Sequence, residues 1–483
     1  MKQFLSELAR AVDAQPSLPQ ALELARHYGS LCWSMGSVVY DSFELERKLA
    51  GRFAEEYRFA PATVPPMKDT LHVASELYLT GGHTRLMEKL AGMHECPPDL
   101  MITRPTPTDV IHKVAEHFAC LHDVSDQPSD IERICHMIKL MVDYKRVVLS
   151  IHPDDIAAVV ACLLAKTVSD VTIYLVNHAD HTFSFGSAAA DFYFELSSYG
   201  RRVDGLKTIS GRKSFLGIPV NGRPVNVRQL PSTAANQNEL VFFSAGSDVK
   251  FKPREGVDIR PLITALLQRH PSATFVVVGP NVWRDTWWWR MKLCFGARLK
   301  LLKIMPYEDY LALIRDASFF VDSHPMPGGT AFAEQLLAGR RCIGLVSPYQ
   351  GYSPAEKMKS ADVDTVCDRV INYHLPPGIV AEVLEVNGYE AVKERYLGCI
   401  YGGHSYPNLL DSLCAWTGDV QFFSHDAGRG NVDVSALAFS GVLRLEPVLA
   451  LKVFAKLRPV KKMKLLIKLA LVSAKRLASG IKG

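Results

Sequence analysis

Residues Gly328, Gly329 and Thr330 combine a sharp turn with the start of a short helix, a pattern that can bind an anion. They follow the apolar run 317–321, and helix-like sequence continues beyond them. The first N–H groups of a helix have no partner inside it, and its dipole is positive at that end, so a diphosphate can bind there. Glu334 lies one helical turn later, where its carboxylate can reach the sugar hydroxyls beside a phosphate. An ordinary tight turn has the same glycines, but the spacing to Glu334 favours a binding site.

Two lysines after the strand-like run 240–246 are candidates for neutralising such a diphosphate. Lys250 and Lys252 both follow this run. A positive charge at this point stabilises the negative charge that develops as a bond to phosphate breaks. The alternative for each is a solvated charge at a strand end, the usual environment of lysine. The turn further along the chain leads us to favour Lys250, and His324, just before that turn, is included in the same predicted site.

Two histidine-containing turns supply candidates for a general base. Histidine suits proton transfer because its ordinary pKa is close to neutral pH. His83 follows Gly81 and Gly82 at the turn after the first predicted strand, and His181 follows Asp180 at the end of another. Asp180 can orient a histidine for catalysis. The alternative for each histidine is a cap or loop residue that makes a backbone hydrogen bond, and the sequence leaves the choice open.

A metal ion could also neutralise a diphosphate, if a pair of aspartates held it. The only plain D-x-D pair is Asp362 and Asp364, far beyond the glycine turn in a segment that reads as a loop. We therefore expect catalysis without a metal and without any bound cofactor.

Strand-like and helix-like segments alternate along the chain in two blocks. Such alternation is typical of a parallel sheet with crossover helices, whose ligands bind beyond the carboxyl ends of the strands. A polar segment, 221–238, separates the blocks. The predicted division is a helical N-terminal extension, an N-terminal Rossmann-like domain, a C-terminal Rossmann-like domain and a basic amphipathic tail, over residues 1–68, 69–232, 233–440 and 441–483.

Composition indicates a globular chain in a reducing compartment. The 483 residues are 48% hydrophobic, enough for two domains with separate cores. The ten cysteines form no C-x-x-C pair, which favours a cytosolic protein over a disulfide framework. The first ten residues lack the apolar core of a signal peptide, and we find no run of eighteen apolar residues. We expect a cytoplasmic protein.

The positive charge of the chain is concentrated at its C-terminal end. Residues 441–483 contain eleven Lys and Arg and one acid, Glu446, so the rest of the chain is net negative. At helical spacing, four lysines fall on one face and apolar residues largely on the other, as in helices that lie on anionic membranes. Packing of the apolar face on the protein body is the alternative. The lysines are Lys461, Lys464, Lys468 and Lys475, and the apolar residues are Met463, Leu466, Ile467, Ala470 and Ala474.

The arrangement resembles the GT-B glycosyltransferases. Segments 244–253 and 327–334 are most similar to the C-terminal domain of the O-linked N-acetylglucosamine transferases and of related bacterial enzymes. The resemblance covers roughly residues 240–345 well and the first block in outline. It implies two Rossmann-like, doubly wound domains that face each other across a cleft. It also implies a nucleotide-diphosphate sugar, usually a UDP-sugar, bound mainly by the second domain, with the acceptor on the first.

The resemblance also implies roles for individual residues. Lys250 would contact the diphosphate, Glu334 would bind the ribose, and the turn would supply backbone and hydroxyl donors from Gly328, Gly329 and Thr330. His83 is similar in position to the base in plant and antibiotic glycosyltransferases of the same fold. The chain lacks the tetratricopeptide array of the eukaryotic O-linked N-acetylglucosamine transferases.

An inverting reaction is the expectation for this chain. Retaining enzymes of the E-x7-E class need a second glutamate eight positions from Glu334, where Met326 and Cys342 stand. We expect a hexosyl- or N-acetylhexosaminyltransferase of polysaccharide biosynthesis that acts on a glycan, lipid-linked or protein acceptor, with no nucleic acid partner. Two alternatives stay open, a sugar-nucleotide epimerase of the same fold and a non-catalytic protein that binds a nucleotide or a partner enzyme.

Overall fold

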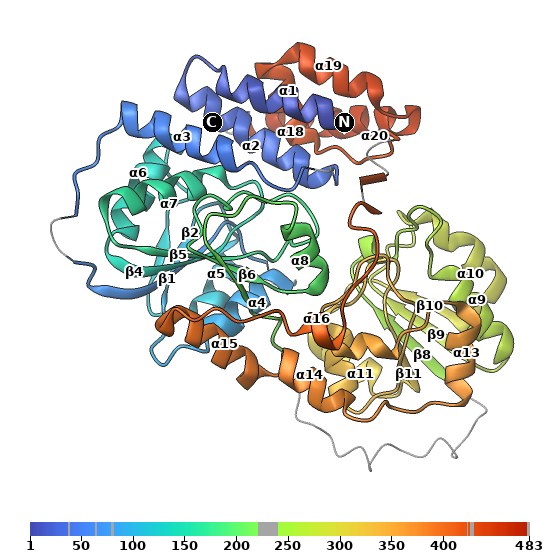
Figure 1. Ribbon diagram of the computed structural model, residues 1–483. Helices are drawn as coiled ribbons and strands as arrows, with labels where there is room; N and C mark the ends of the chain where they lie inside the picture. Colours follow the sequence, from blue (N-terminus) through green and yellow to red (C-terminus); the bar gives the residue numbers. More distant parts are fainter. Residues whose placement is uncertain are drawn as a thin grey trace.

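The computed structural model describes residues 1–36, 39–62, 65–78, 82–220, 240–422, 424–425 and 429–480. It contains two parallel β-sheets side by side, each with its own helices (Figure 1). This confirms the predicted fold class, two α/β domains of the GT-B type. Gly81, the segment 221–238 and the predicted boundary at 232/233 lie outside the described residues.

The first sheet has seven strands in the order β3-β2-β1-β4-β5-β6-β7, all pairs parallel. Its strands are β1 (Lys68–Ala74), β2 (Asp99–Ile102), β3 (Leu121–Asp123), β4 (Tyr144–Ser150), β5 (Thr172–Val176), β6 (Phe192–Glu195) and β7 (Arg212–Phe215). Its helices are α4 (Gly82–Ala91), α5 (Thr108–Ala115), α6 (Asp130–Met141), α7 (Ile156–Val168) and α8 (Ser198–Asp204).

The second sheet has five parallel strands in the order β10-β9-β8-β11-β12. They are β8 (Val241–Ala245), β9 (Thr274–Val278), β10 (Leu299–Leu302), β11 (Phe319–Val321) and β12 (Cys342–Ile343). The surrounding helices include the 3-10 helix η2 (Asp248–Phe251), α9 (Arg260–Arg269), α10 (Trp289–Phe295), α11 (Tyr307–Ile314), α12 (Thr330–Leu337) and α13 (Val363–Ile371).

Both sheets are covered by helices, which explains the nearly continuous apolar sequence of their central strands. Residues 147–150 of β4 and 275–278 of β9 are all buried. Two buried clusters line the two faces of the second sheet, and they draw alternate residues of β9, since successive side chains of a strand point to opposite faces. Both faces of the strands are therefore packed against apolar side chains, and polar groups lie at the carboxyl ends of the strands.

The chain returns to the first domain after completing the second. Helix α14 (Ile379–Asn387) packs on the second domain, and α15 (Tyr389–Gly402) follows at once. Residues Tyr396 and Ile400 of α15 belong to the same buried cluster as Val148 of β4, and Arg146 and Tyr174 both donate hydrogen bonds to the carbonyl of Ile400. Helix α15 lies within the range predicted for the second domain, yet it covers the first sheet.

The two ends of the chain form one helical layer over the first domain (Figure 1). It consists of α1 (Lys2–Asp13), α2 (Leu18–Ser34) and α3 (Phe43–Glu56) with α18 (Ala436–Leu445), α19 (Pro447–Lys456) and α20 (Pro459–Gly480). Lys452 pairs with Glu7 at 2.9 Å, and Gln15 donates to Glu446 at 2.7 Å. The basic tail is thus joined to the N-terminal extension by both packing and polar contacts.

Helix α20 packs on this layer with a face that differs from the predicted one. Leu465 is buried, and Leu469 and Val472 are partly buried against the same core. Met463, Leu466 and Ile467, from the predicted apolar face, are 54–60% exposed. The tail therefore has two apolar faces, one on the body and one open to solvent. No helix among the described residues is long and apolar enough to cross a bilayer.

We predict opposite effects on stability for alanine at two helical glycines. A methyl group at Gly441 of α18 would overlap the ring of His27 in α2, and such overpacking costs about 1–3 kcal/mol. The matched control is Gly51 in α3, which is exposed and has no atom near an added methyl, so alanine there stabilises the helix by about 0.5–1 kcal/mol. Thermal unfolding should show a lower Tm for Gly441→Ala and a higher Tm for Gly51→Ala. Equal Tm values would contradict the packing of α18 on α2.

Candidate functional site

The strand order of the second sheet changes direction between β8 and β11. From β8 the chain proceeds outward to β9 and β10, and then returns to β11 on the other side of β8. Ligands of open α/β sheets bind at such a switch point, beyond the carboxyl ends of the strands. The segments that leave β8 and β11 contain Lys250 and the turn 322–330, the two parts that the sequence indicated.

Asp322 organises the turn between β11 and α12. One of its carboxylate oxygens accepts hydrogen bonds from the N–H groups of Ser323 and Gly328, at 2.9 and 2.8 Å, and the other is 2.7 Å from the buried ammonium of Lys359. The N–H of Gly328 therefore has a partner in the protein, and its contact with a ligand stays a prediction. Glycine is also needed here for space, since a Cβ would come within 2.5 Å of Asp322.

Gly329 forms the open end of α12. Its φ of +58° is in the region that favours glycine, and an added Cβ would have no atom within 4 Å. The helix begins at Thr330, without a side-chain cap hydrogen bond at its N-terminal end. The N–H of Ala331 donates to the carbonyl of Gly328 at 3.3 Å, and Gly329 and Thr330 are partly exposed. The positive end of the helix dipole is therefore accessible to an anion.

Lys250 is attached to this turn, whereas Lys252 points elsewhere. The Lys250 ammonium donates to the carbonyl of Pro327 at 3.1 Å, and the N–H of Met326 donates to the carbonyl of Lys250. Burial lowers the pKa of Lys250, while the charge of Asp322 opposes this change. Lys252 pairs instead with Asp433 at 2.8 Å. The structure thus distinguishes two lysines that the sequence could only rank.

His324 and Glu334 lie on either side of the turn. His324 is 4% exposed, its Nδ1 has no hydrogen-bond partner among the described residues, and burial lowers its pKa to about 4. Glu334 is 3.6 Å from Lys89 of α4, and burial raises the pKa of its carboxyl. Glu334, the residue predicted to bind the ribose, therefore lies at the contact between the two domains, next to α4, whose first turn contains His83.

The first sheet has its own switch point, between β1 and β4. His83, in the first turn of α4, donates from Nε2 to the carbonyl of Ser150 at the end of β4, at 2.8 Å. Its ring stacks on His178 with 3.9 Å between ring centres. Burial lowers the pKa of His83 to about 4. Since Nε2 carries the hydrogen, Nδ1 keeps a lone pair that can accept a proton.

A second histidine at this switch point was not identified from the sequence. His152 follows β4, and its Nδ1 is 2.6 Å from the carboxylate of Asp154. Arg104 donates to the same carboxylate at 2.7 Å and lies 3.6 Å from Glu76. Burial opposes ionisation of Asp154, but His152 and Arg104 hold its pKa well below the usual range. The run Ile151-His-Pro-Asp-Asp155 after a strand was the available signal.

Asp180 and His181 lie at the contact between the domains rather than beside His83. Asp180 is buried, accepts a hydrogen bond from the hydroxyl of Tyr352 in the second domain at 2.9 Å, and is 3.7 Å from Nδ1 of His181. The His181 ring stacks on Tyr349 with 5.6 Å between centres. From this segment it is His178 that meets His83.

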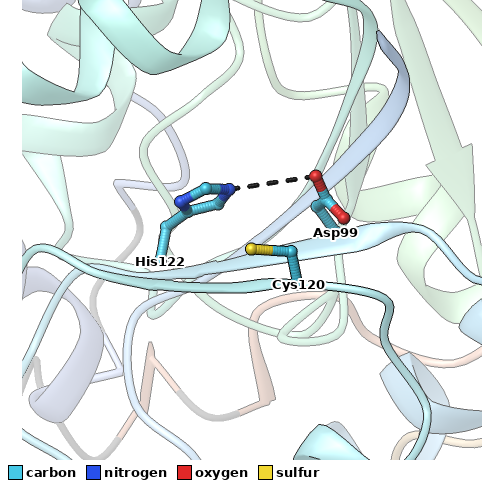
Figure 2. A group of neighbouring side chains, drawn as sticks. All are labelled: Asp99, Cys120 and His122. Atoms are coloured by element: carbon cyan, nitrogen blue, oxygen red, sulfur yellow. Dashed lines mark ion pairs between the residues drawn. The ribbon is translucent and has the colours of Figure 1, made fainter.

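The D-x-D pair, expected in a loop, lies instead at the start of α13, where both aspartates have structural roles. Asp362 caps α13 by accepting from the N–H of Thr365, and Asp364 pairs with Arg269 at 2.5 Å. A different group, Asp99, Cys120 and His122, has the residue types of a metal site, with ligand atoms within 4.8 Å of one another (Figure 2).

That cluster does not belong to the candidate site. Asp99 begins β2 and Cys120 precedes β3, so the cluster lies at the edge of the sheet away from the strands' carboxyl ends. The Asp99 carboxylate already has two partners, the ammonium of Lys68 at 3.0 Å and the hydroxyl of Tyr144 at 2.5 Å. Metal-independent chemistry remains a prediction from the sequence.

The chain is similar to known proteins in structure but not in sequence. No family model matches the chain, and no curated protein is similar to it in sequence. Three solved structures resemble it: a mutant O-GlcNAc transferase of Thermobaculum terrenum (15% identity, TM-score 0.48, 93% of this chain and 81% of that chain), HepE of Anabaena with UDP-glucose (11%, 0.49, 69% and 99%), and the UDP-GlcNAc 2-epimerase of Neisseria meningitidis with UDP-GlcNAc (12%, 0.42, 68% and 97%). The first belongs to the family that the sequence resembles. The functional proposal rests on the geometry of the site.

Proposed function

We propose that the chain is an inverting, metal-independent glycosyltransferase that uses a UDP-sugar. Its acceptor is a glycan, a lipid-linked glycan or a protein, and its setting is cell-surface glycan synthesis on the cytoplasmic side of a membrane. The observation that carries the proposal is the position of Lys250 against the turn at the open N-terminus of α12, at the switch point of the second sheet.

The donor end of this site matches the charge that forms during transfer. Breaking the bond between sugar and diphosphate leaves a UDP leaving group with growing negative charge. The N-terminal N–H groups of α12 and the ammonium of Lys250 are fixed before the reaction, so they stabilise this charge without rearrangement. Glu334, one turn along α12, is within reach of a ribose, and His324 offers an uncharged ring nitrogen beside the turn.

The acceptor end supplies the base. His83 is held by the Ser150 carbonyl and by stacking on His178, and it is uncharged at neutral pH because burial lowers its pKa. Helix α4, which has His83 in its first turn, also contains Lys89, the partner of Glu334. Base and donor site are thereby connected by one helix and one ion pair. Asp180 and His181 are the second assignment for the same role.

The tail supports contact with an anionic membrane. The predicted apolar face of α20 is exposed, and Lys464 and Lys468 lie beside it, also exposed. A helix with an open apolar face and flanking lysines binds anionic lipid by both burial and charge. We expect the full chain to bind vesicles that contain phosphatidylglycerol, and to release them as salt rises.

Substitutions at Lys250 and Glu334 should separate phosphate binding from ribose binding. Lys250→Met keeps the length of the side chain and removes the charge, so we expect affinity for UDP to fall about tenfold or more and affinity for uridine to change little. Glu334→Gln should weaken both ligands to a similar extent. Lys252→Met is the matched control and should leave UDP binding unchanged, because Lys252 pairs with Asp433. Titration calorimetry measures all three, and equal losses of UDP and uridine in Lys250→Met would exclude a phosphate contact.

A further inference from the structure

A cavity of about 590 Å³ lies where four parts of the chain meet. The end of α2 contributes Trp33, the first domain contributes His181, the second domain contributes Lys252 and Arg254, and α20 contributes Lys461 and Lys468. We call this the basic pocket. None of Gly328, Gly329, Thr330 and Glu334 lines it, so it is separate from the donor turn.

The charge of the basic pocket is strongly positive. Two lysines from the tail and Lys252 and Arg254 from the second domain line it, and Asp433 is the one acidic residue among its described lining residues. Asp433 pairs with both Lys252 and Lys461, each at 2.8 Å. Burial opposes ionisation of Asp433, but the two ammonium groups hold its pKa well below the usual range. Four cationic side chains and one carboxylate thus line the described pocket, and this net positive charge suits a ligand with more than one negative charge.

The pocket also has an apolar wall that adjoins both switch points. Trp33 is 40% exposed, and its ring meets the ring of His152 with 4.7 Å between centres. Met326 and Val249 line the pocket on the other side, next in sequence to Pro327 and Lys250 of the donor turn. A ligand in the pocket would therefore lie between the histidines of the first domain and the donor site of the second, where an acceptor belongs.

We infer that the basic pocket binds the phosphate-bearing end of the acceptor. The inference rests on the proposed transfer reaction and gives its acceptor a chemical class, a sugar attached to phosphate or diphosphate. The ring of Trp33 offers a stacking surface to the sugar, and the lysines and Arg254 bind the phosphate. Such an acceptor can be soluble or lipid-linked, and the exposed apolar face of α20 beside Lys468 makes the lipid-linked form the expectation.

The test is titration of the full chain, first saturated with UDP, with inorganic pyrophosphate. Saturation occupies the donor turn, so any further binding reports a second site. We expect wild type to bind pyrophosphate under these conditions, and Lys468→Gln and Arg254→Gln each to weaken it about tenfold. Lys464→Gln is the matched control, since it removes an exposed lysine of the same helix that does not line the pocket. Loss of pyrophosphate binding to the same extent in all three variants, or its absence in wild type, would overturn the inference.

Two further measurements distinguish a lipid-linked from a soluble acceptor, and a failure of the pocket assignment from a failure of the proposed function. In the first, dodecyl phosphate, kept below its critical micelle concentration, replaces pyrophosphate. Binding that is tighter than that of pyrophosphate and still depends on Lys468 assigns a lipid-linked acceptor. Binding no tighter than that of pyrophosphate assigns a soluble one. UDP binding is measured before either ligand is added. If UDP fails to bind but pyrophosphate binding still depends on Lys468, the proposed function is wrong and the pocket stands; if UDP binds and pyrophosphate does not, only the pocket assignment fails.

Discussion

Replacing His83 by glutamine should reduce sugar transfer by about two to four orders of magnitude, the usual contribution of a positioned general base. The glutamine amide can still donate to the Ser150 carbonyl, so the start of α4 keeps its anchor, but the basic ring nitrogen is lost. Transfer of radiolabelled sugar measures the rate, and UDP binding should change less than threefold, about 0.7 kcal/mol.

The pH profile gives an independent check on this base. The His83 pKa is lowered to about 4, so the ring stays uncharged as pH falls through 6.5, the ordinary pKa of histidine. We therefore expect kcat/KM to be level from neutral pH to about pH 5 and to fall as pH approaches 4. A decline centred near pH 6.5, together with full activity in His83→Gln, would move the role to another histidine. His181→Gln and His152→Gln then identify which one.

The fold could be predicted because its main strands are buried on both sides. Residues such as 147–150 and 274–278 form apolar runs between helix-like segments, and that pattern is typical of parallel sheets. Strands β3 and β7, at the two edges of the first sheet, were not predicted. β3 and β7 have three and four residues and carry exposed polar side chains, so their sequence reads as loop. The return of α15 to the first sheet depends on tertiary packing, which helical spacing does not encode.

The site was predicted in part. Thr330 and Glu334 are close in sequence and lie one turn apart on α12, as their spacing predicted, while their binding roles stay predictions. The contacts that Asp154 makes with His152 and Arg104 were not predicted, because Arg104 lies far from Asp154 in the chain and Pro153 follows the histidine. Lys250 and Lys252 could not be separated by sequence, since only the fold shows that one meets Pro327 and the other Asp433. The sequence likewise did not reveal that α20 has two apolar faces, one packed on the body and one open to solvent.

The central claim, a diphosphate site at the start of α12, can be tested at Gly329. Its side-chain direction is open, but its φ of 58° and ψ of −108° lie outside the αL region and favour glycine, so any side chain there adds backbone strain. Gly329→Asp and Gly329→Asn carry the same strain and differ by one negative charge, so their comparison isolates the effect of charge. At about 4 Å and an effective dielectric of about 20, a carboxylate opposes one phosphate charge by about 4 kcal/mol.

The decisive measurement is the Kd of UDP for these two variants, with folding checked by circular dichroism and Tm. The site described here predicts that Gly329→Asp weakens UDP at least a hundredfold relative to Gly329→Asn, while Gly329→Asn stays within about tenfold of wild type, or about 1.4 kcal/mol. Equal UDP affinity in the aspartate and asparagine variants, with both folded, would contradict a diphosphate at this turn.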